Sequence, residues 1–229
     1  MLFGMPQTAA PDEGAIKFEA RHSDGSLDAQ RFGDLVCKLV AWREILARTG
    51  LVGRDAALYG GYAYGNVSGR VGPFPGTRRQ RAFVVSGSGS SGKPRVGIED
   101  FTVVTRCEPE SNRVTSSGPC LPSSESLTHG AIYDLAPHIR FVFHVHSPTI
   151  WRRARALRVP ETAAAVPYGS PEMAREVERL YRSSPLAEIG ILAMGGHEDG
   201  IVVFGRTAEE AGQVVLRYLA RAYEAECRC

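Results

Sequence analysis

Two histidines stand two positions apart in FVFHVHS, which spans residues 141–147. The rest of this run is mostly apolar, which is typical of a buried strand. Because alternate strand residues point to one face, His144 and His146 project together while Phe143 and Val145 face the other way. Two adjacent imidazoles suit a metal ion such as Zn²⁺, which needs one or two further ligands. An isolated pair is also common as ordinary capped or exposed histidines at a strand end.

A third ligand must come from a distant segment, and the remaining histidines are His22, His129, His138 and His197. His22 lies in the charged N-terminal region, where a solvated side chain is the simpler interpretation. His129 lies inside a predicted helix. His197 lies in MGGHEDG, a glycine-rich loop between two predicted strands, and this position suits a ligand best.

A carboxylate precedes the histidine pair in the segment SSESLTH. Glu125 lies near a predicted helix start, and His129 follows four residues later on the same face. An acidic residue in the first turn is also favourable through the helix dipole alone. Because this helix leads through Pro137 directly into the histidine strand, Glu125 is a candidate neighbour of the metal.

Three segments rich in glycine and serine are candidate anion sites. They are GNVSGR (65–70), SGSGSSGK (86–93) and the pair Ser123 and Ser124 at a helix start. Free backbone N–H groups, hydroxyls and Arg70 or Lys93 are available there to hold an anion. Each segment alone is equally well explained as an ordinary loop, but together they favour a phosphate site beside the metal.

The elements that must position these residues follow from hydrophobic periodicity. Helices are predicted over residues 30–50, 122–137, 171–184 and 207–226, and strands over 81–87, 101–109, 140–147, 189–196 and 200–205. Ser123 or Ser124 is the predicted N-cap of the second helix. Strands and helices mix without strict alternation, which predicts a single α/β domain with a mostly antiparallel or mixed sheet flanked by helices.

Composition excludes several classes of protein. The 229 residues are 43% hydrophobic and 23% charged, which is ordinary for a globular protein. A net charge of +2 does not favour a nucleic-acid partner, and no apolar run is long enough to predict a membrane span. Five scattered cysteines predict a reducing, cytoplasmic location. Residues 1–25 are predicted to be a loosely ordered tail, and residues 26–229 the folded domain.

Taken together, these motifs resemble the class II aldolase/adducin family, and within it the fuculose-phosphate aldolases. The matching pieces are YGNVSGR, VVSGSGSSG, LPSSESLTHGAIYDLAPHIRFVFHVHSP and MGGHEDGIVVFG, all within residues 30–225. The resemblance implies a three-layer α/β/α sandwich around a mostly antiparallel central sheet. It also implies a homotetramer with active sites near the subunit interfaces.

The resemblance also implies roles for individual residues. His144, His146 and His197 match the ligands of Zn²⁺, for which Mn²⁺, Co²⁺ or Fe²⁺ are alternatives. Glu125 matches the acid/base residue, which can also coordinate the metal. The residues that match contacts to a substrate phosphate are Gly65, Asn66, Ser88, Gly89, Ser123 and Ser124. Within that set, Ser88 and Gly89 depend on the register chosen for the loop SGSGSSG.

The implied activity is that of a metal-dependent lyase acting on a small, phosphorylated hydroxy-carbonyl substrate. An aldolase of this kind cleaves a C–C bond through a metal-stabilised enediolate. A sugar-phosphate 4-epimerase, a dehydratase or a decarboxylase on the same site are alternatives. An adducin-like, non-enzymatic interaction domain is an alternative of another class, and it would have no physical need for the metal ligands.

The third-ligand loop departs from the family pattern. The family has a glycine directly after the histidine, whereas here the loop reads His197-Glu198-Asp199-Gly200. Both acidic side chains are predicted to face water, and the alternatives are that they tune the metal site or join it.

A second departure concerns a proton-donating tyrosine. Fuculose-phosphate aldolases supply it from a neighbouring subunit, in a segment that is shorter here. Tyr168, Tyr218 and Tyr223 are the candidates in this chain, and each is also explained by packing.

Overall fold

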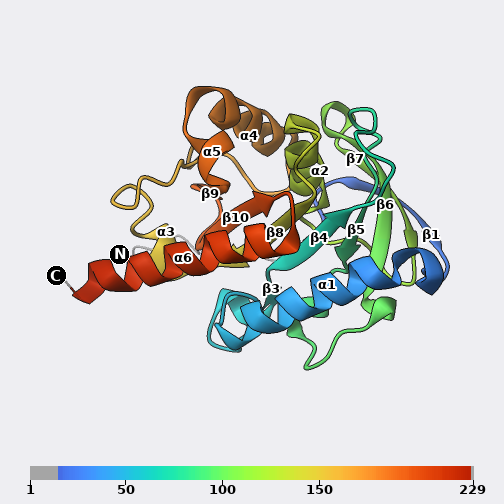
Figure 1. The fold of residues 1–229 in the computed structure, drawn as a ribbon, viewed down its shortest axis with the longest axis horizontal. Helices are drawn as coiled ribbons and strands as arrows, with labels where there is room; N and C mark the ends of the chain where they lie inside the picture. The colour runs from blue at the N-terminus through green and yellow to red at the C-terminus, as the bar shows by residue number, and fades with distance from the viewer. Residues whose placement is uncertain (1–14, 228–229) are drawn as a thin grey trace, which may run out of the picture.

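The structure is a computed structural model and describes residues 15–227 (Figure 1). Its strands are β1 (Glu19–Asp24), β2 (Gly53–Arg54), β3 (Ala63–Tyr64), β4 (Asn66–Arg70), β5 (Phe83–Ser86), β6 (Phe101–Glu108), β7 (Arg113–Gly118), β8 (Phe141–His146), β9 (Ile191–Ala193) and β10 (Gly200–Gly205). Its α-helices are α1 (Ala29–Arg48), α2 (Ser126–Leu135), α3 (Pro148–Trp151), α4 (Pro171–Ser183), α5 (Leu186–Ile189) and α6 (Ala208–Cys227).

Eight strands form one sheet in the order β1-β7-β6-β5-β4-β8-β10-β9, and β2 pairs with β3 separately. Within the described residues, β1 and β7 are the parallel neighbours of the large sheet, and its other pairs are antiparallel. The predicted α/β class with a mostly antiparallel sheet is confirmed. Strand β1 falls inside the range 1–25 that was predicted to be a loosely ordered tail. Residues 1–14 of that range lie outside the described residues, so the predicted domain boundary stays a prediction.

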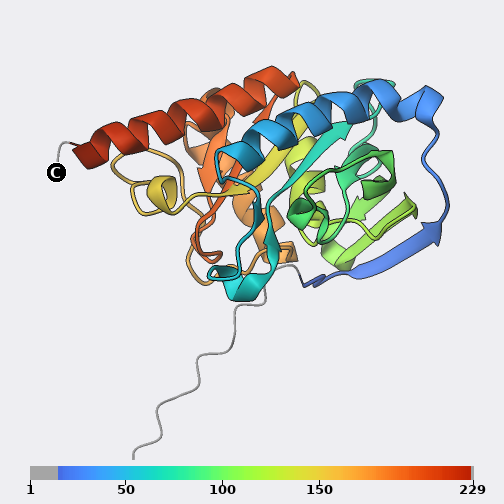
Figure 2. The same ribbon diagram turned by 90° about the horizontal axis from the view of Figure 1, so that it is seen from below.

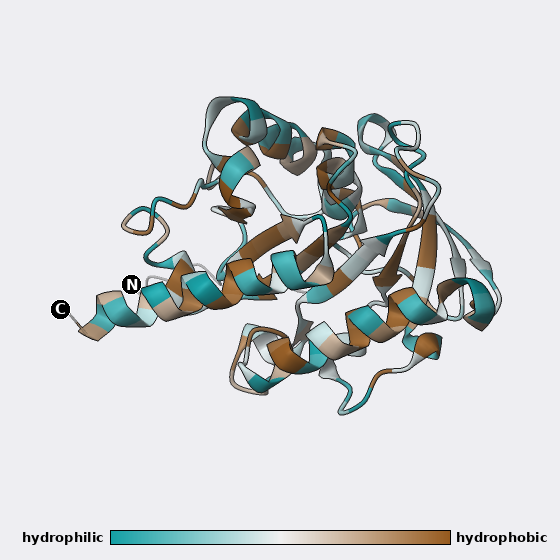
Figure 3. Ribbon diagram, in the orientation of Figure 1, coloured by the Kyte–Doolittle hydropathy of each residue, from teal (hydrophilic) through white to brown (hydrophobic). Residues whose placement is uncertain are grey.

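Helices pack against both faces of the sheet. Figure 2 shows α1 and α6 along one side, and both helices contact central strands there. Helices α2 and α4 pack against each other, and α2 contacts β6, β7 and β8. The apolar residues of the central strands appear brown in Figure 3. In β8, Phe143 and Val145 join the α1 and α6 core, whereas Val142 joins the core under α2 and α4. The two histidines of β8 therefore face the α2 side, as the period-2 pattern predicted.

The helix that carries Glu125 begins later than predicted. Its first helical residue is Ser126 and its N-cap position is Glu125, so the predicted serine N-cap is wrong. Ser123 instead closes a turn ahead of the helix, because its carbonyl oxygen accepts from the Ser126 N–H at 3.0 Å. The Ser123 hydroxyl accepts from the Glu125 N–H at 3.3 Å. This turn places Glu125 at the start of the helix, where the residue is 2% exposed.

No helix among residues 15–227 combines the length and the apolar composition needed to cross a membrane.

Candidate metal centre and active site

Three histidine side chains converge at the end of β8. His144 and His146 come from β8, and His197 comes from the loop between β9 and β10. The His146 Nε2 atom lies 3.2 Å from Nε2 of His144 and 3.1 Å from Nε2 of His197. The His197 and His144 Nε2 atoms are 3.3 Å apart. Each of the three residues is at most 6% exposed, so this cluster is largely shielded from bulk water.

The spacing of the three nitrogens fits a metal ion. Nitrogens that bind Zn²⁺ at about 2.0–2.1 Å in tetrahedral geometry lie roughly 3.3–3.4 Å from one another. Three Nε2 lone pairs at this separation repel each other unless a proton or a cation lies between them. One proton cannot serve three nitrogens at once, whereas one metal ion can. The donor set therefore fits a metal ion, with His144, His146 and His197 as the residues that would hold it.

The histidines are in the protonation state that ligation needs. Burial lowers the pKa of His144 to about 4, and burial also holds the pKa values of His146 and His197 well below the usual range. All three are therefore neutral near pH 7. The His144 Nδ1 atom lies 3.3 Å from the carbonyl oxygen of Ile201, which favours the tautomer with its proton on Nδ1. That tautomer leaves the Nε2 lone pair directed at the cluster.

Two glycines let the His197 loop turn tightly against its neighbours. A Cβ atom on Gly196 would lie 2.1 Å from the carbonyl oxygen of Val166, and one on Gly195 would lie 2.2 Å from that of Thr162. Neither approach is sterically allowed, so the sequence MGGH suits this loop because only glycine fits there. The loop is closed by hydrogen bonds from the His197 N–H to Met194 O and from the Gly200 N–H to His197 O, at 3.1 and 3.0 Å.

Glu125 is a buried carboxyl group beside the histidines. Neither of its oxygens has a hydrogen-bond partner within the described residues. Burial raises its pKa to about 7, and the Lys17 charge and the nearby Thr128 hydroxyl, which does not reach hydrogen-bond geometry with the carboxyl group, counteract this rise. An unsatisfied, buried carboxyl group is costly, so this position calls for a partner such as a substrate proton or a cation. Glu125 lines one small pocket together with His144.

The predicted phosphate contacts line this same pocket. They are Gly65, Asn66, Ser88, Gly89, Ser123 and Ser124. The Oδ1 atom of Asn66 is buried and has no partner within the described residues, which leaves its side chain available to a ligand. Gly65 has φ +77°, and a Cβ atom there would lie 2.5 Å from Cγ1 of Val52. A side chain at this position would therefore disturb the wall of the pocket.

Arg70 and Lys93, which were predicted to help hold an anion, make other contacts in the structure. Residues 66–70 form the buried central strand β4, so most of their N–H groups pair with neighbouring strands. The Arg70 guanidinium donates to the carbonyl oxygens of Pro137 and Pro75, and Lys93 pairs with Asp100 at 2.5 Å. The interpretation of Arg70 and Lys93 as anion ligands is therefore wrong.

A buried arginine holds the second Gly/Ser segment in place. The NH2 group of Arg43, on α1, donates to the carbonyl oxygens of Ser91 and Lys93, both at 2.6 Å. The Ser91 hydroxyl in turn donates to the Gly65 carbonyl oxygen. The two segments that line the pocket are thus fixed to each other and to α1.

Tyr59 and Asp199 were not found as site residues from the sequence. The Tyr59 ring lies against His146 with 4.5 Å between ring centroids, and its hydroxyl donates to Asp199 Oδ2 at 2.8 Å. Asp199 is 4% exposed, so the prediction that it faces water is wrong, whereas Glu198 is exposed as predicted. Both Tyr59 and Asp199 have positive φ, at 48° and 62°. Such backbone strain is typical of functional sites. The signal in the sequence was the tyrosine- and glycine-rich run LYGGYAYG.

Replacing Tyr59 by phenylalanine is expected to weaken metal binding by about tenfold, the lower end of the effect of losing a group that positions a ligand. The variant keeps the ring on His146 but loses the hydrogen bond that ties this ring to the His197 loop through Asp199. A competition titration against a chelator measures the effect. Tyr62→Phe is the matched control, because Tyr62 is 53% exposed on the same loop. Equal affinities in the two variants and the unmodified protein would rule out this positioning role.

The other tyrosine and histidine candidates lie in different surroundings. Tyr168 is buried with its ring 4.5 Å from that of His197, whereas Tyr218 packs in the α1 and α6 core and Tyr223 is 51% exposed. His22 contacts Ser116 Oγ at 2.9 Å, and His129 Nδ1 lies 2.7 Å from Ser68 Oγ.

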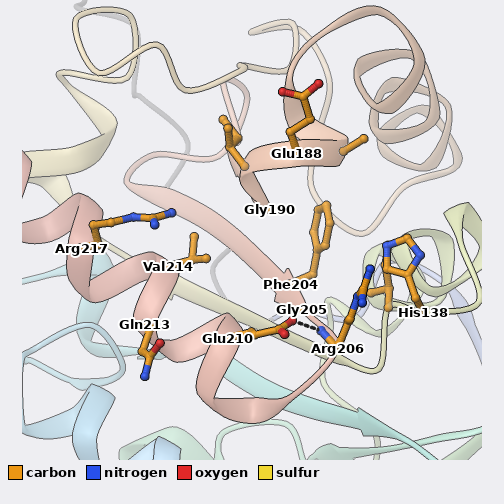
Figure 4. A pocket seen from close by; sticks show the side chains of 13 residues that line it. His138, Glu188, Gly190, Phe204, Gly205, Arg206, Glu210, Gln213, Val214 and Arg217 are labelled. Atoms are coloured by element: carbon orange, nitrogen blue, oxygen red, sulfur yellow. Dashed lines mark hydrogen bonds between the residues drawn. The ribbon is translucent and has the colours of Figure 1, made fainter.

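His138 lines a different and larger pocket. This pocket lies between α5, α6 and the end of β10, and Figure 4 shows His138, Arg206, Glu210 and Arg217 around it. None of the predicted metal or phosphate residues lines it.

The fold and the histidine cluster define an α/β protein with a candidate metal centre, and the comparisons specify the family. Residues 46–225 match the family described as Class II Aldolase and Adducin N-terminal domain. The chain belongs to this family, and the predicted resemblance is confirmed. A comparison with curated proteins found no match.

Solved structures with the same fold include several aldolases. An L-fuculose 1-phosphate aldolase is 18% identical with a TM-score of 0.59, and the match covers 88% of this chain and 87% of that one. The L-fuculose-1-phosphate aldolase from Thermus thermophilus is 20% identical with a TM-score of 0.61, over 86% and 94% of the two chains. A sugar-phosphate aldolase from Thermotoga maritima is 15% identical with a TM-score of 0.58, over 86% and 96%. These identities are low, so the likeness establishes the fold.

Proposed function

We propose that this protein is a metal-dependent, aldolase-type lyase that cleaves a C–C bond in a small, phosphorylated hydroxy-carbonyl compound. The observation that carries the proposal is the convergence of three neutral histidine nitrogens, 3.1–3.3 Å apart, beside a buried carboxyl group that has no hydrogen-bond partner among the described residues. The serine and glycine residues in the same pocket supply the complementary anion site. Membership of the class II aldolase family supports this proposal.

His144, His146 and His197 would hold the metal, for which Zn²⁺ is proposed and Mn²⁺, Co²⁺ or Fe²⁺ are alternatives. When bound there, the metal supplies Lewis acidity that polarises a substrate carbonyl and makes the adjacent carbon easier to deprotonate or cleave. Glu125 is the proposed catalytic residue, because its pKa of about 7 allows it to accept and return a proton near neutral pH. Its burial keeps bulk water away from that proton.

The substrate phosphate is proposed to lie against Gly65, Asn66, Ser88, Gly89, Ser123 and Ser124. Their hydroxyls, amide and backbone N–H groups would fix the register of the substrate relative to Glu125. Arg43 fixes the position of the segment that carries Ser88 and Gly89, since it holds the Ser91 and Lys93 carbonyl oxygens.

Product analysis with metal-loaded protein tests the proposal. A panel of ketose phosphates is incubated with the protein, and the expected products are an aldehyde and a shorter carbonyl fragment, formed only with metal present. Interconversion of two sugar phosphates without fragments would identify a 4-epimerase instead. Loss of water would identify a dehydratase, and loss of CO₂ from a sugar phosphate that also carries a carboxylate, added to the panel, would identify a decarboxylase. One solved structure of the same fold, YgbL from Escherichia coli, is described as a candidate aldolase, epimerase or decarboxylase.

A non-enzymatic, adducin-like interaction domain is the alternative from another class. Elemental analysis of protein purified without added metal separates the two hypotheses. About one equivalent of a transition metal supports the lyase. A nearly metal-free protein that does not take up metal would support the interaction domain.

We further propose the three-layer α/β/α arrangement, a homotetramer and a cytoplasmic location, as the sequence predicted. The packing of helices on both faces of the sheet supports the layering. The free thiols of Cys37, Cys107, Cys120 and Cys227 are compatible with a reducing compartment. Analytical ultracentrifugation measures the oligomeric state directly.

A further inference from the structure

Residues 15–18 form a fixed strap beside the candidate metal centre. The Phe18 side chain is 6% exposed and belongs to the core under α2 and α4. The carbonyl oxygen of Lys17 accepts from Asn112 Nδ2 at 2.7 Å, and that of Ala15 accepts from the Tyr168 hydroxyl at 3.5 Å. These contacts hold the backbone of Lys17 in place next to Tyr168.

The Lys17 side chain reaches toward the histidine cluster. Its Nζ atom lies 3.7 Å from the centroid of the Tyr168 ring, and the same ring lies 4.5 Å from the His197 ring. One aromatic ring therefore separates a lysine ammonium from a proposed metal ligand. Within residues 15–227, Lys17 forms no ion pair, in contrast to Lys93, which pairs with Asp100.

The positive charge of Lys17 acts on the carboxyl group of Glu125. Burial raises the pKa of Glu125, and the Lys17 ammonium acts against that rise. Lys17 therefore contributes a positive potential at the proposed base.

The phosphate pocket lacks such a cation among the described residues. Its lining contains serines, glycines, an asparagine, Glu125 and His144, but neither a lysine nor an arginine. His144 borders this pocket, whereas His197, Tyr168 and Lys17 do not. The site thus has a phosphate pocket without a lysine or arginine on its His144 side and a lysine ammonium near its His197 side.

We propose that Lys17 forms a second anion subsite, on the His197 side of the site, for a carboxylate or phosphate group of the substrate. Lys17 would donate a charge-assisted hydrogen bond to one anionic oxygen, and Tyr168 would hold the ammonium through its ring face. Lys17 lies before residues 46–225, which match the family model. The inference rests on the proposed function, since it assumes that the substrate binds between the two subsites.

Anion titrations of the Zn²⁺-loaded protein test the subsite without turnover. Inorganic phosphate and glycolate are titrated separately by calorimetry into the unmodified protein and into Lys17→Gln. We expect Lys17→Gln to weaken binding of at least one of these anions by about tenfold, because a hydrogen bond to a charged group is lost. Weakening of glycolate alone identifies a carboxylate subsite, and weakening of phosphate alone identifies a phosphate subsite.

Two further variants separate charge from packing. Lys17→Arg keeps the charge and is expected to bind both anions within about threefold of the unmodified protein. Lys38→Gln removes an exposed lysine on α1 and is expected to have no effect. If both anions bind Lys17→Gln as they bind the unmodified protein, the subsite is refuted. A lower Tm in that variant with unchanged anion affinity would show that Lys17 only braces Tyr168, and would also refute it.

The two proposals fail in different ways. Absence of cleavage products, with a clear effect of Lys17→Gln on anion binding, would reject the lyase function and keep the anion subsite. Cleavage of a ketose phosphate at an unchanged KM in Lys17→Gln, with unchanged anion affinity, would keep the lyase and reject the subsite.

Discussion

Glu125→Gln is expected to lower kcat by about 10²–10⁴-fold while leaving the bound metal in place, because general acid–base catalysis typically contributes this much. The amide has nearly the same size as the carboxyl group, so the buried space at the start of α2 stays filled. The glutamine amide, however, cannot accept a proton from a substrate carbon. Steady-state kinetics and elemental analysis of the same preparations measure the two parts of this prediction.

The pH dependence of activity provides a second readout for Glu125. Its pKa is raised to about 7 by burial, and a cation held by the histidines would lower that value. A base must be deprotonated to accept a proton, so kcat/KM is expected to fall as the pH drops below the pKa of Glu125. The acidic limb is therefore expected at or below about pH 7.

Glu198, which follows His197 in the sequence, provides the control for Glu125→Gln. Glu198 is exposed and lies next to His197, so Glu198→Gln is expected to keep both activity and the acidic limb. Undiminished turnover in Glu125→Gln would remove Glu125 from the mechanism. Loss of metal together with activity would instead make Glu125 a metal ligand.

The histidine cluster shows which parts of the site can be predicted from sequence. The period of two along FVFHVHS places both imidazoles on one face, and the structure has Phe143 and Val145 in the opposite core. His197 could be predicted from its glycine-rich loop, since Gly196 allows an approach to the Val166 carbonyl oxygen that no other residue would permit. The alternation and the glycine pair can both be read from the local sequence, although the Val166 contact that requires the glycine is seen only in the structure.

Tyr59, Asp199 and Lys17 could not be predicted as neighbours of the site. Tyr59 and Asp199 are separated by 140 positions, and their hydrogen bond exists only because two loops with positive φ meet beside His146. Lys17 lies in a segment with no clear periodicity, and contacts of residues 15–18 with the distant residues Asn112 and Tyr168 place it near the site. The run LYGGYAYGNVSGR indicated a loop and a short strand, but only the tertiary structure shows that residues 66–70 are the strand and that they lie buried between β5 and β8.

His146→Gln is expected to reduce metal affinity by more than about 100-fold, because it removes a direct ligand where loss of an outer partner alone costs about 10–100-fold. His146 is the residue common to the two shortest contacts of the cluster, at 3.1 and 3.2 Å. The remaining pair, His144 and His197, leaves too few protein ligands for tight binding of Zn²⁺. Glutamine fills much of the buried space, so the fold is expected to persist.

Thermal unfolding measures this loss without any assay of activity. Metal that binds only the folded state stabilises it, by about 4 kcal/mol when the free metal is at roughly 1,000 times its Kd. Added Zn²⁺ is therefore expected to raise the Tm of the unmodified protein and to leave that of His146→Gln nearly unchanged. His138→Gln removes an exposed histidine earlier in the chain and is expected to respond as the unmodified protein does. An equal rise in Tm for His146→Gln would show that the metal binds elsewhere, because a site built on His146 cannot stabilise a chain that lacks it.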